Sequence, residues 1–373
     1  MKITGIINEP PFDPVSWSGT ARHFFGALDR AGILAGALDV RMSDLADKAF
    51  RAMNFALPMD VWKERYHLDE RRFRALTRVA GKRLRDSGLA GQGVLQIGAW
   101  YCMPDVTDQP CYSYHDGNLA LRVRAGHIGL PADHARVQSM LRWERETYAK
   151  LTGIFVMSSW LGDSFAKDFG VPTSKIHVVG AGINFETIPP ERVRTASAPR
   201  FLMVGRDFVR KGGEILMRAF TDVRRKIPTA ELVLIGPQIS SPPPGVRCLG
   251  YLSKKNPAHV ELIETTYREA GIYVLPSLYE PFGISLLEAM SHSLPCIAAN
   301  HCAMPEIVRH GETGLVVTPG DSDALAAAML ELAQQPAKAI AFGAAGRKRL
   351  LDRYTWDAVA AQIKQAVGAG PGS

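Results

Sequence analysis

The sequence predicts an α/β protein of two domains, each built on a parallel β-sheet. Short apolar runs alternate with stretches whose apolar residues recur every three or four positions, a pattern typical of buried strands separated by amphipathic helices. With 373 residues, the chain is long for one hydrophobic core and favours two. A polar, proline-bounded stretch, Pro189–Pro199, lacks apolar periodicity, and a new strand–loop–helix series begins at Phe201. This stretch is the predicted linker.

The predicted strands are short and almost wholly apolar. They cover Lys2–Asn8, Gly93–Ala99, Gly153–Ser158, Arg200–Gly205, Ala230–Gly236, Gly271–Pro276 and Leu294–Ala299, and one more ends near His115. Helices are expected between them, for example over Thr20–Ala31 and Ala258–Ala270. The resulting domains cover residues 1–188 and 199–352, both Rossmann-like. Residues 353–373 are expected to form a helix, over Asp357–Val367, that crosses back to the first domain, and then a flexible tail.

Composition narrows the functional classes. Hydrophobic residues make up 46% of the chain and charged residues 22%, the balance of a globular protein. No apolar run of the roughly 18 residues needed to span a membrane is present, and the N-terminus resembles a first buried strand rather than a signal peptide. The five cysteines are scattered without a Cys-x-x-Cys pair, which favours a reduced, cytoplasmic compartment over disulfides or zinc.

Much of the net charge of +7 lies in one segment, Lys63–Arg85, which contains nine basic residues and three acidic ones. Within it, Asp69–Arg85 is a predicted helix with one apolar face formed by Phe73, Leu76, Ala80 and Leu84. Such a helix more often packs its apolar stripe inside and solvates its arginines. Peripheral contact with an anionic membrane is the lesser alternative. Nucleic-acid binding is not expected, because no known module accompanies the charge.

The most informative segment runs from the end of the strand at Leu275 into a helix that bears Glu288, with Glu280 on the intervening loop. Ligands collect outside the carboxyl ends of parallel strands. Glu288 is predicted to accept hydrogen bonds from ribose hydroxyls, and Glu280 from sugar hydroxyls. The alternatives are a capping box formed by Ser285 and Glu288, and a solvated loop carboxylate at Glu280.

The same segment offers backbone donors at the start of its helix. The N–H groups of Gly283, Ile284, Ser285 and Leu286 are predicted to face an anion there, aided by the helix dipole. The glycine allows a phosphate to approach the main chain closely.

Two cations follow the strand at Arg200–Gly205. Arg206 and Lys211 lie on the loop that precedes the next helix. Fixed cations stabilise the charge that gathers on a leaving diphosphate, and Arg206 can grip phosphate with two donors while Lys211 acts as a compact charge. The alternative is ordinary loop charge, which is the interpretation preferred for Arg210.

Together these segments resemble the retaining glycosyltransferases of family 4, in which two glutamates are separated by seven residues. The resemblance covers about residues 200–360. It is also carried by the Gly-Arg-x4-Lys-Gly pattern at Gly205 and by Gly250-Tyr251-Leu252, Leu294-Pro295-Cys296-Ile297-Ala298, Pro305-Glu306-Ile307-Val308 and Gly314-Leu315-Val316-Val317. It implies the GT-B fold, two facing Rossmann-like domains with parallel sheets and a cleft between them. It also implies that Glu288 holds the donor ribose, that Glu280 holds the transferred sugar, and that the main chain of Tyr251 and Leu252 lies near the base.

Two candidates in the N-terminal half rest mainly on this resemblance. Gly19 lies between the first strand and the first helix, where a backbone can meet phosphate; family members often have two glycines there, and this chain has Ser18-Gly19. His115 is similar to the histidine that many members place near the reacting sugar. The alternative for His115 is an imidazole that anchors a turn beside Asp116.

Two further sequence features concern a possible metal site and the pocket for the donor sugar. Asp321-Ser322-Asp323 matches the Asp-x-Asp metal motif of other glycosyltransferases, but it precedes an alanine-rich helix and is predicted to cap that helix. No metal or other cofactor is therefore expected. Ser291–Leu294 and His301–Met304 replace glycines that lie near the donor sugar in the family.

The resemblance and the residues together predict a retaining, metal-independent glycosyltransferase of the hexosyltransferase type. It would move a sugar from a nucleotide-diphosphate donor, UDP- or GDP-sugar, to a hydroxyl of a glycan, a lipid-linked sugar or a small molecule. The leaving phosphate would accept the acceptor's proton, with His115 and Glu280 positioning the sugar. The alternatives are a GT-B-like epimerase or phosphorylase, and a non-catalytic nucleotide-sugar-binding protein.

Overall fold

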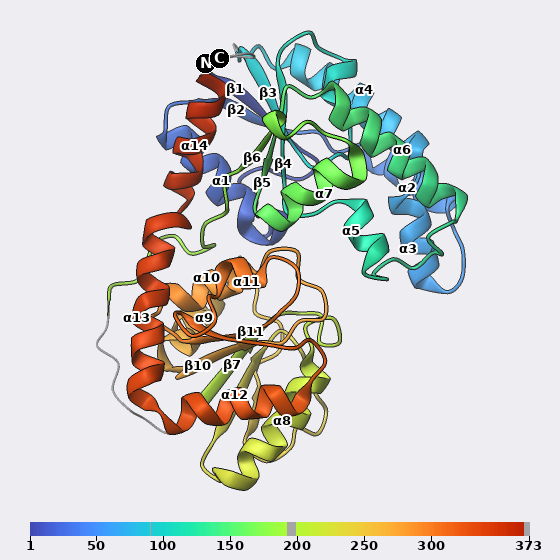
Figure 1. The fold of residues 1–373 in the computed structure, drawn as a ribbon. Helices are drawn as coiled ribbons and strands as arrows, with labels where there is room; N and C mark the ends of the chain where they lie inside the picture. The colour runs from blue at the N-terminus through green and yellow to red at the C-terminus, as the bar shows by residue number, and fades with distance from the viewer. Residues whose placement is uncertain (90, 192–198, 369–373) are drawn as a thin grey trace. The chain divides into compact units, whose positions relative to one another are not determined.

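The computed structural model describes residues 1–89, 91–191 and 199–368 (Figure 1). It divides into two compact units. The first consists of Met1–Trp17, Ala21–Gly180 and the chain from Asp357 onward, and the second of Ser18–Thr20 and Ala181–Trp356. Each unit is built on a six-stranded parallel sheet, which confirms the predicted α/β class. Residues 192–198 of the predicted linker and 369–373 of the predicted tail lie outside the described residues.

The sheet of the first unit has the strand order β2-β1-β3-β4-β5-β6. Because β1 pairs with both β2 and β3, the chain winds outward in both directions from that point. The strands are β1 (Ile3–Ile7), β2 (Leu34–Asp39), β3 (Gly93–Ile97), β4 (Cys111–His115), β5 (Gly153–Val156) and β6 (Ile176–Val178). The helices are α1 (Thr20–Arg30), α2 (Asp44–Met53), α3 (Met59–His67), α4 (Glu70–Asp86), α5 (Leu119–Arg124), α6 (Ala135–Lys150), α7 (Ser159–Phe169) and α14 (Trp356–Gly368).

The sheet of the second unit has the order β12-β11-β10-β7-β8-β9, with β7 paired to both β10 and β8. Its strands are β7 (Arg200–Val204), β8 (Glu231–Ile235), β9 (Val246–Cys248), β10 (Ile272–Leu275), β11 (Cys296–Ala299) and β12 (Gly314–Val317). Its helices are α8 (Gly213–Lys226), α9 (Pro257–Glu269), α10 (Ile284–Ser291), α11 (Met304–Ile307), α12 (Ser322–Gln334) and α13 (Pro336–Arg353).

The packing of the hydrophobic cores explains why the sequence predicts the central strands. In the second unit, Phe201 of β7 and Leu232 of β8 are completely buried and pack with Leu216, Phe220 and Met329 from α8 and α12. A strand covered on both faces needs a continuous apolar run. By contrast, β2, β6, β9 and β12 were not predicted as strands, and all four lie at sheet edges. Their residues are mostly half-exposed, so no fully buried apolar run marks them.

Helix α4 packs its apolar stripe inside, as the sequence predicts. Phe73, Leu76 and Ala80 are buried, and Leu84 packs against the same core. One detail of that prediction is wrong, because Arg72 is not in solvent: only 5% of it is exposed. No helix among the described residues has the length and apolar character needed to cross a membrane.

The cap predicted at Asp321 is confirmed. Its carboxylate accepts hydrogen bonds from the N–H groups of Asp323 (3.0 Å) and Ala324 (2.9 Å) at the start of α12. An aspartate at this position satisfies donors that the first helical turn leaves open. This carboxylate therefore has a structural task of its own.

Candidate functional site

The second unit has its topological switch point between β7 and β10. Chain segments that leave neighbouring parallel strands on either side of such a point part from one another and leave room for a ligand at the carboxyl ends. The loop after β7 carries Arg206 and Lys211, and the loop after β10 carries Glu280. The sheet order thus brings together two loops that are distant in sequence.

Lys211 and Glu280 meet across this point. The Lys211 ammonium donates a hydrogen bond to Oε2 of Glu280, and only 10% and 13% of the two side chains are exposed. Arg210 joins them: its Nη1 donates to the carbonyl of Tyr279 (2.7 Å) and lies 3.5 Å from the same Glu280 oxygen. The interpretation of Arg210 as ordinary loop charge is therefore wrong, as is that of Glu280 as a solvated carboxylate.

Two glycines shape the loop that holds these cations. A Cβ on Gly205 would lie 2.8 Å from Cε of Lys211, so the lysine stem needs the bare backbone. Gly212 has φ +73°, in the left-handed region, and a Cβ there would lie 2.1 Å from the carbonyl oxygen of Pro276. The close approach presses the start of α8 against the exit of β10. This contact fixes Lys211, the preceding residue, opposite Glu280.

Arg206 has a different partner. Its guanidinium lies 4.7 Å from the centre of the Tyr251 ring, within the range of a cation–π contact. Tyr251 follows β9 and is 52% exposed, and Arg206 is exposed as well. Leu252 follows on the same loop and is half-buried. The structure therefore places Arg206 with the predicted base-binding segment, and Lys211 with the predicted sugar-binding glutamate.

Helix α10 begins at Gly283, which has φ +103° and offers no side chain to cap the first turn. The N–H of Leu286 is not available, because it donates to the Gly283 carbonyl (2.9 Å). The prediction of a free donor at Leu286 is therefore wrong, as expected once the first helical turn closes on itself. Gly283, Ile284 and Ser285 remain the candidate donors at this helix start.

Glu288 lies one turn further along α10 and does not form the alternative capping box. Its Oε1 lies 3.2 Å from Nζ of Lys254, and its Oε2 accepts a hydrogen bond from the hydroxyl of Tyr267 (3.1 Å). Burial and the nearby Glu288 charge raise the pKa of Tyr267 well above its usual value, so the hydroxyl keeps its proton. Lys254 also donates to the carbonyl of Asn184 (3.1 Å). Neither Lys254 nor Tyr267 was among the predicted site residues.

The comparison with protein families finds its match in the second unit. A family model described as "Glycosyl transferases group 1" matches residues 198–335. The match covers about a third of the chain, and residues 198–335 are called the glycosyltransferase domain after it. The domain contains Arg206, Lys211, Tyr251, Glu280 and Glu288, and so both loops of the switch point.

Curated relatives share part of their length with this chain. A GDP-mannose-dependent alpha-(1-6)-phosphatidylinositol monomannoside mannosyltransferase of Mycobacterium tuberculosis is 30% identical over 237 residues, 56% of this chain and 59% of the relative. A glycogen synthase of the same species is 31% identical over 225 residues, 57% of this chain and 53% of the relative. The chain thus spans somewhat more than half the length of these relatives.

The similarity to solved structures extends beyond the glycosyltransferase domain. A sucrose-phosphate synthase from Thermosynechococcus elongatus has a TM-score of 0.73 at 19% identity, covering 99% of both chains. HepE of Anabaena, in complex with UDP-glucose, has a TM-score of 0.68 at 15% identity, covering 99% of this chain and 100% of its own. At these identities the likeness concerns the fold, and it confirms the predicted GT-B fold class.

Outside the glycosyltransferase domain, Gly19 ends a stretch of unusual backbone. Trp17 and Ser18 have φ of +46° and +59°, and Gly19 has φ +92°. Residues other than glycine adopt this region at a cost of about 1–2 kcal/mol each, and such costs are often found where backbone shape serves a ligand. This backbone shape supports Gly19 as a candidate ligand contact, which stays a prediction.

His115, at the carboxyl end of β4, is only 3% exposed. Its Nε2 is 2.8 Å from the Ser113 hydroxyl, and its ring packs edge-on against Tyr148 and Phe165. In this conformation the imidazole belongs to the interior of the first unit. Its predicted contact with the reacting sugar stays a prediction, and the described contacts are those of an anchoring residue.

The burial of His115 has a measurable consequence for stability. Burial lowers its pKa to about 3, below the value near 6.5 of an unfolded chain. The folded state therefore resists a proton that the unfolded state accepts, so this stability is complete above pH 6.5 and is lost as the pH falls. Between pH 6.5 and 5 the loss is about 2 kcal/mol from this histidine.

We expect His115→Asn to flatten the pH dependence of the unfolding free energy between pH 6.5 and 5 by about 2 kcal/mol. Urea unfolding of both proteins at several pH values measures the two slopes, which matter more than the absolute stabilities. His67, whose pKa burial and nearby cations lower to about 4, keeps part of the slope in the variant. Equal slopes in the two proteins would show that His115 takes up a proton normally when folded.

Proposed function

We propose that this protein transfers a sugar from a nucleotide-diphosphate sugar to an acceptor hydroxyl. The observation that carries the proposal is the meeting of Lys211 and Glu280 at the switch point of a group 1 glycosyltransferase domain. A largely buried cation is held there beside a carboxylate, where a diphosphate and its sugar can both be bound. Since the chain spans only part of its curated relatives, its substrates are proposed from its own residues.

In the proposed reaction, the bond between the anomeric carbon and the diphosphate oxygen breaks while the acceptor oxygen bonds to that carbon. Negative charge gathers on the leaving diphosphate. Lys211 and Arg206, helped by the N–H groups of Ile284 and Ser285, stabilise this charge. Arg210 supports them indirectly, because it holds Glu280 and the Tyr279 carbonyl in place.

The two glutamates bind hydroxyl groups in this proposal. Glu280 accepts hydrogen bonds from the transferred sugar, and Glu288 accepts them from the ribose. In the structure, Lys254 and Tyr267 contact the two Glu288 oxygens. The ribose hydroxyls would therefore replace or share these contacts, and Lys254 would then face the nucleotide.

We also propose retention at the anomeric carbon and catalysis without a metal ion. The leaving phosphate would accept the proton of the acceptor hydroxyl, so that no separate carboxylate base is needed. Lys211, Arg206 and Arg210 supply positive charge of the kind that a divalent ion supplies elsewhere. The involvement of Asp321 in a helix cap supports this view, since that carboxylate is already bound to backbone donors.

A UDP- or GDP-sugar is the proposed donor, and a glycan, a lipid-linked sugar or a small molecule the proposed acceptor. The mannosyltransferase relative is named for its dependence on GDP-mannose, which supports the GDP-sugar. We propose a cytoplasmic location, supported by the absence of disulfides among the described cysteines. Membrane contact through α4 would have to rely on its basic residues alone, because its apolar stripe is buried.

Calorimetry of the metal-free protein with UDP, GDP and ADP tests the donor site. We expect one diphosphate to bind in the presence of a chelator, and Glu288→Ala to weaken it about 10- to 100-fold, because two ribose hydrogen bonds of about 1 kcal/mol each are lost. Glu261→Ala, an exposed glutamate of α9, is the matched control and should bind normally. Binding that requires a divalent ion would contradict the metal-free proposal.

A second assay separates transfer from the alternatives. The donor sugar named by calorimetry is incubated with and without candidate acceptors, and the products are resolved by nuclear magnetic resonance. Formation of an α-linked product from an α-linked donor supports retaining transfer. An epimerised donor formed without acceptor, or tight binding without any turnover, would replace the transferase proposal.

A further inference from the structure

Arg72 in the first turn of α4 is a buried cation without a matching anion. It is 5% exposed, and its Nε and Nη1 have no hydrogen-bond partner. Among the described residues no carboxylate lies within ion-pair distance of its guanidinium. A buried charge without a partner costs several kcal/mol, and an anion supplied by a ligand would offset that cost.

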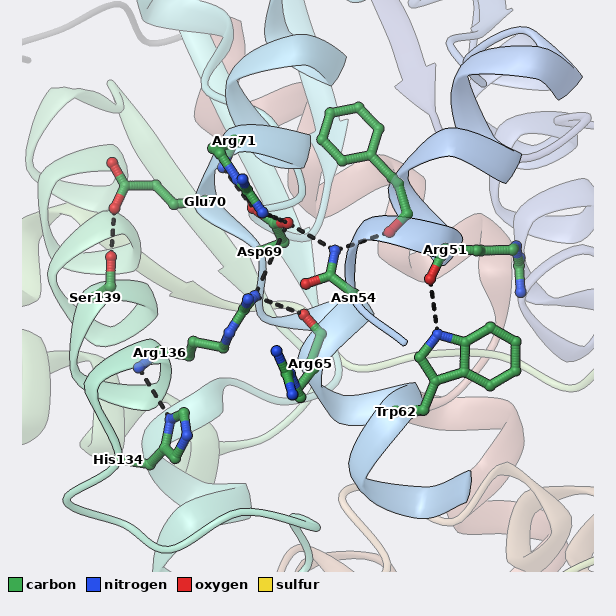
Figure 2. Close-up of polar contacts among 11 residues, drawn as sticks. Arg51, Asn54, Trp62, Arg65, Asp69, Glu70, Arg71, His134, Arg136 and Ser139 are labelled. Carbon is green, nitrogen blue, oxygen red and sulfur yellow. Dashed lines mark hydrogen bonds and ion pairs between the residues drawn. The ribbon is translucent and has the colours of Figure 1, made fainter. Parts of the chain in front are cut away.

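The nearby carboxylates are already bound to other residues. Asp69 accepts hydrogen bonds from Asn54 (2.7 Å) and Arg71 (2.9 Å) and lies 3.8 Å from Arg136, and Glu70 accepts one from Ser139 (Figure 2). The further contacts are Glu70 with Arg74, Asp47 with Arg51 and the Tyr66 hydroxyl, and Glu64 with Arg122. Asp47 interacts with Arg72 electrostatically, but its carboxylate is already paired with Arg51. Glu64 keeps one buried oxygen without a hydrogen-bond partner, and no ion pair joins it to Arg72 among the described residues.

Aromatic rings frame the Arg72 guanidinium instead. It lies 4.4 Å from the centre of the Tyr66 ring and 5.9 Å from that of Trp100. Arg51 lies 4.6 Å from the same Tyr66 ring, which places a second cation close by. Rings hold a guanidinium in place but carry no net charge. The local balance therefore stays positive.

The framing ring of Trp100 connects Arg72 to the sheet and to solvent. Trp100 lies on the loop directly after β3, is 37% exposed and contacts the ring of His67 (5.9 Å). Since β3 neighbours β1, where the winding of this sheet diverges, the loop stands at the switch point of the first unit, where ligands of such sheets bind. A rotation of this partly exposed indole would open Arg72 to a ligand.

We propose that Arg72, His67 and Trp100 form a binding site for a phosphate group, separate from the glycosyltransferase domain. The Nε–H and Nη1–H groups of Arg72 have no hydrogen-bond partner, and each offers a charged donor to a phosphate oxygen. His67 has a buried Nδ1 without a hydrogen-bond partner. Burial, followed by the surrounding cations Arg72, Lys63, Arg122 and Arg51, lowers the pKa of His67, and a bound phosphate would oppose the part that the cations contribute. The site stands on these contacts and does not depend on the proposed sugar transfer.

Titration with inorganic phosphate at constant ionic strength tests the site. The parent protein should carry Arg206→Ala and Lys211→Met, so that phosphate binding to the glycosyltransferase domain is removed. We expect Arg72→Met to weaken phosphate binding at least tenfold, consistent with the loss of about 1.4 kcal/mol or more of charge-assisted hydrogen bonding. Arg78→Met, an exposed arginine on the same helix, is the matched control and should leave binding unchanged.

Thermal unfolding without phosphate separates binding from folding. A buried cation that lacks an anion destabilises the free protein, so Arg72→Met should melt at the same temperature as the parent or higher, and phosphate should raise the midpoint of the parent only. The proposal would be overturned if Arg72→Met melted at a lower temperature than the parent and if phosphate either bound both proteins equally or did not bind the parent. Arg72→Lys, which keeps the charge, should retain part of the phosphate response.

The source of the phosphate is settled by two further probes. Binding of glucose 6-phosphate but not glucose, lost in Arg72→Met, supports a soluble phosphorylated ligand. Flotation with vesicles of phosphatidylcholine and phosphatidylglycerol but not of phosphatidylcholine alone, lost in Arg72→Met, supports a lipid headgroup. If no phosphate-bearing probe depends on Arg72, the site does not bind phosphate.

Discussion

Replacing Lys211 with methionine is expected to lower kcat/KM for sugar transfer about 100- to 1,000-fold, the range found when one fixed group that stabilises transition-state charge is removed. Only 10% of the lysine side chain is exposed, so ions from solvent would not readily replace its charge. Its loss also leaves the carboxylate of Glu280 with Arg210 as its remaining cation, 3.5 Å away. In the proposed reaction, one substitution would therefore disturb both the leaving group and the sugar contact.

Steady-state kinetics with the donor identified by calorimetry measure this effect. Arg218→Met is the control, because Arg218 is an exposed cation on α8 of the same domain; its kcat/KM should stay within twofold. The reduction in Lys211→Met should appear in kcat more than in the KM for the donor, since the charge on the diphosphate grows as the bond breaks. A reduction of less than tenfold would remove Lys211 from the catalytic machinery.

Gly212→Ala is expected to lower the unfolding free energy by about 3 kcal/mol, the sum of a left-handed backbone and an overpacked contact. The new Cβ would lie 2.1 Å from the Pro276 carbonyl oxygen, and a backbone atom cannot move aside as a flexible side chain can. Relief of the clash separates α8 from the exit of β10. The variant should therefore also lose nucleotide binding where the protein remains folded.

Gly320→Ala separates the two contributions. Gly320 has φ +82°, but a Cβ there would have no atom within 4 Å. Gly320→Ala should lower the unfolding free energy by about 1 kcal/mol, which is the contribution of the left-handed backbone alone. Urea unfolding of both variants measures the difference, which reports the contact with Pro276. Equal losses in the two variants would show that the loop after β7 can shift without penalty.

The sequence predicts the central strands and the two loops of the glycosyltransferase domain, because both have local signals. Buried strands need apolar runs, and Glu280 and Glu288 stand in a compact motif next to a glycine. Arg210, Lys254 and Tyr267 have no such signal. Each acquires its role from a partner 21 to 70 positions away, and only the sheet order brings those partners together.

The first unit was harder to predict for a related reason. The positive charge of α4 is plain in the sequence, and so is its apolar stripe, but the burial of Arg72 depends on the rings of Tyr66 and Trp100 from other segments. His115 was identified by resemblance, while its surroundings come from α6 and α7. Periodicity predicts which face of a helix is buried, and it does not predict which charged residue is buried with it.

The ion pair between Lys211 and Glu280 also constrains which substitutions this chain can accept during evolution. The two residues are 69 positions apart, yet a change at either one leaves a largely buried charge on the other before any donor is present. A single substitution is thus selected against through folding as well as through activity. Descendant sequences should keep both residues or alter both, so the pair should covary even in lineages whose donor sugar has changed.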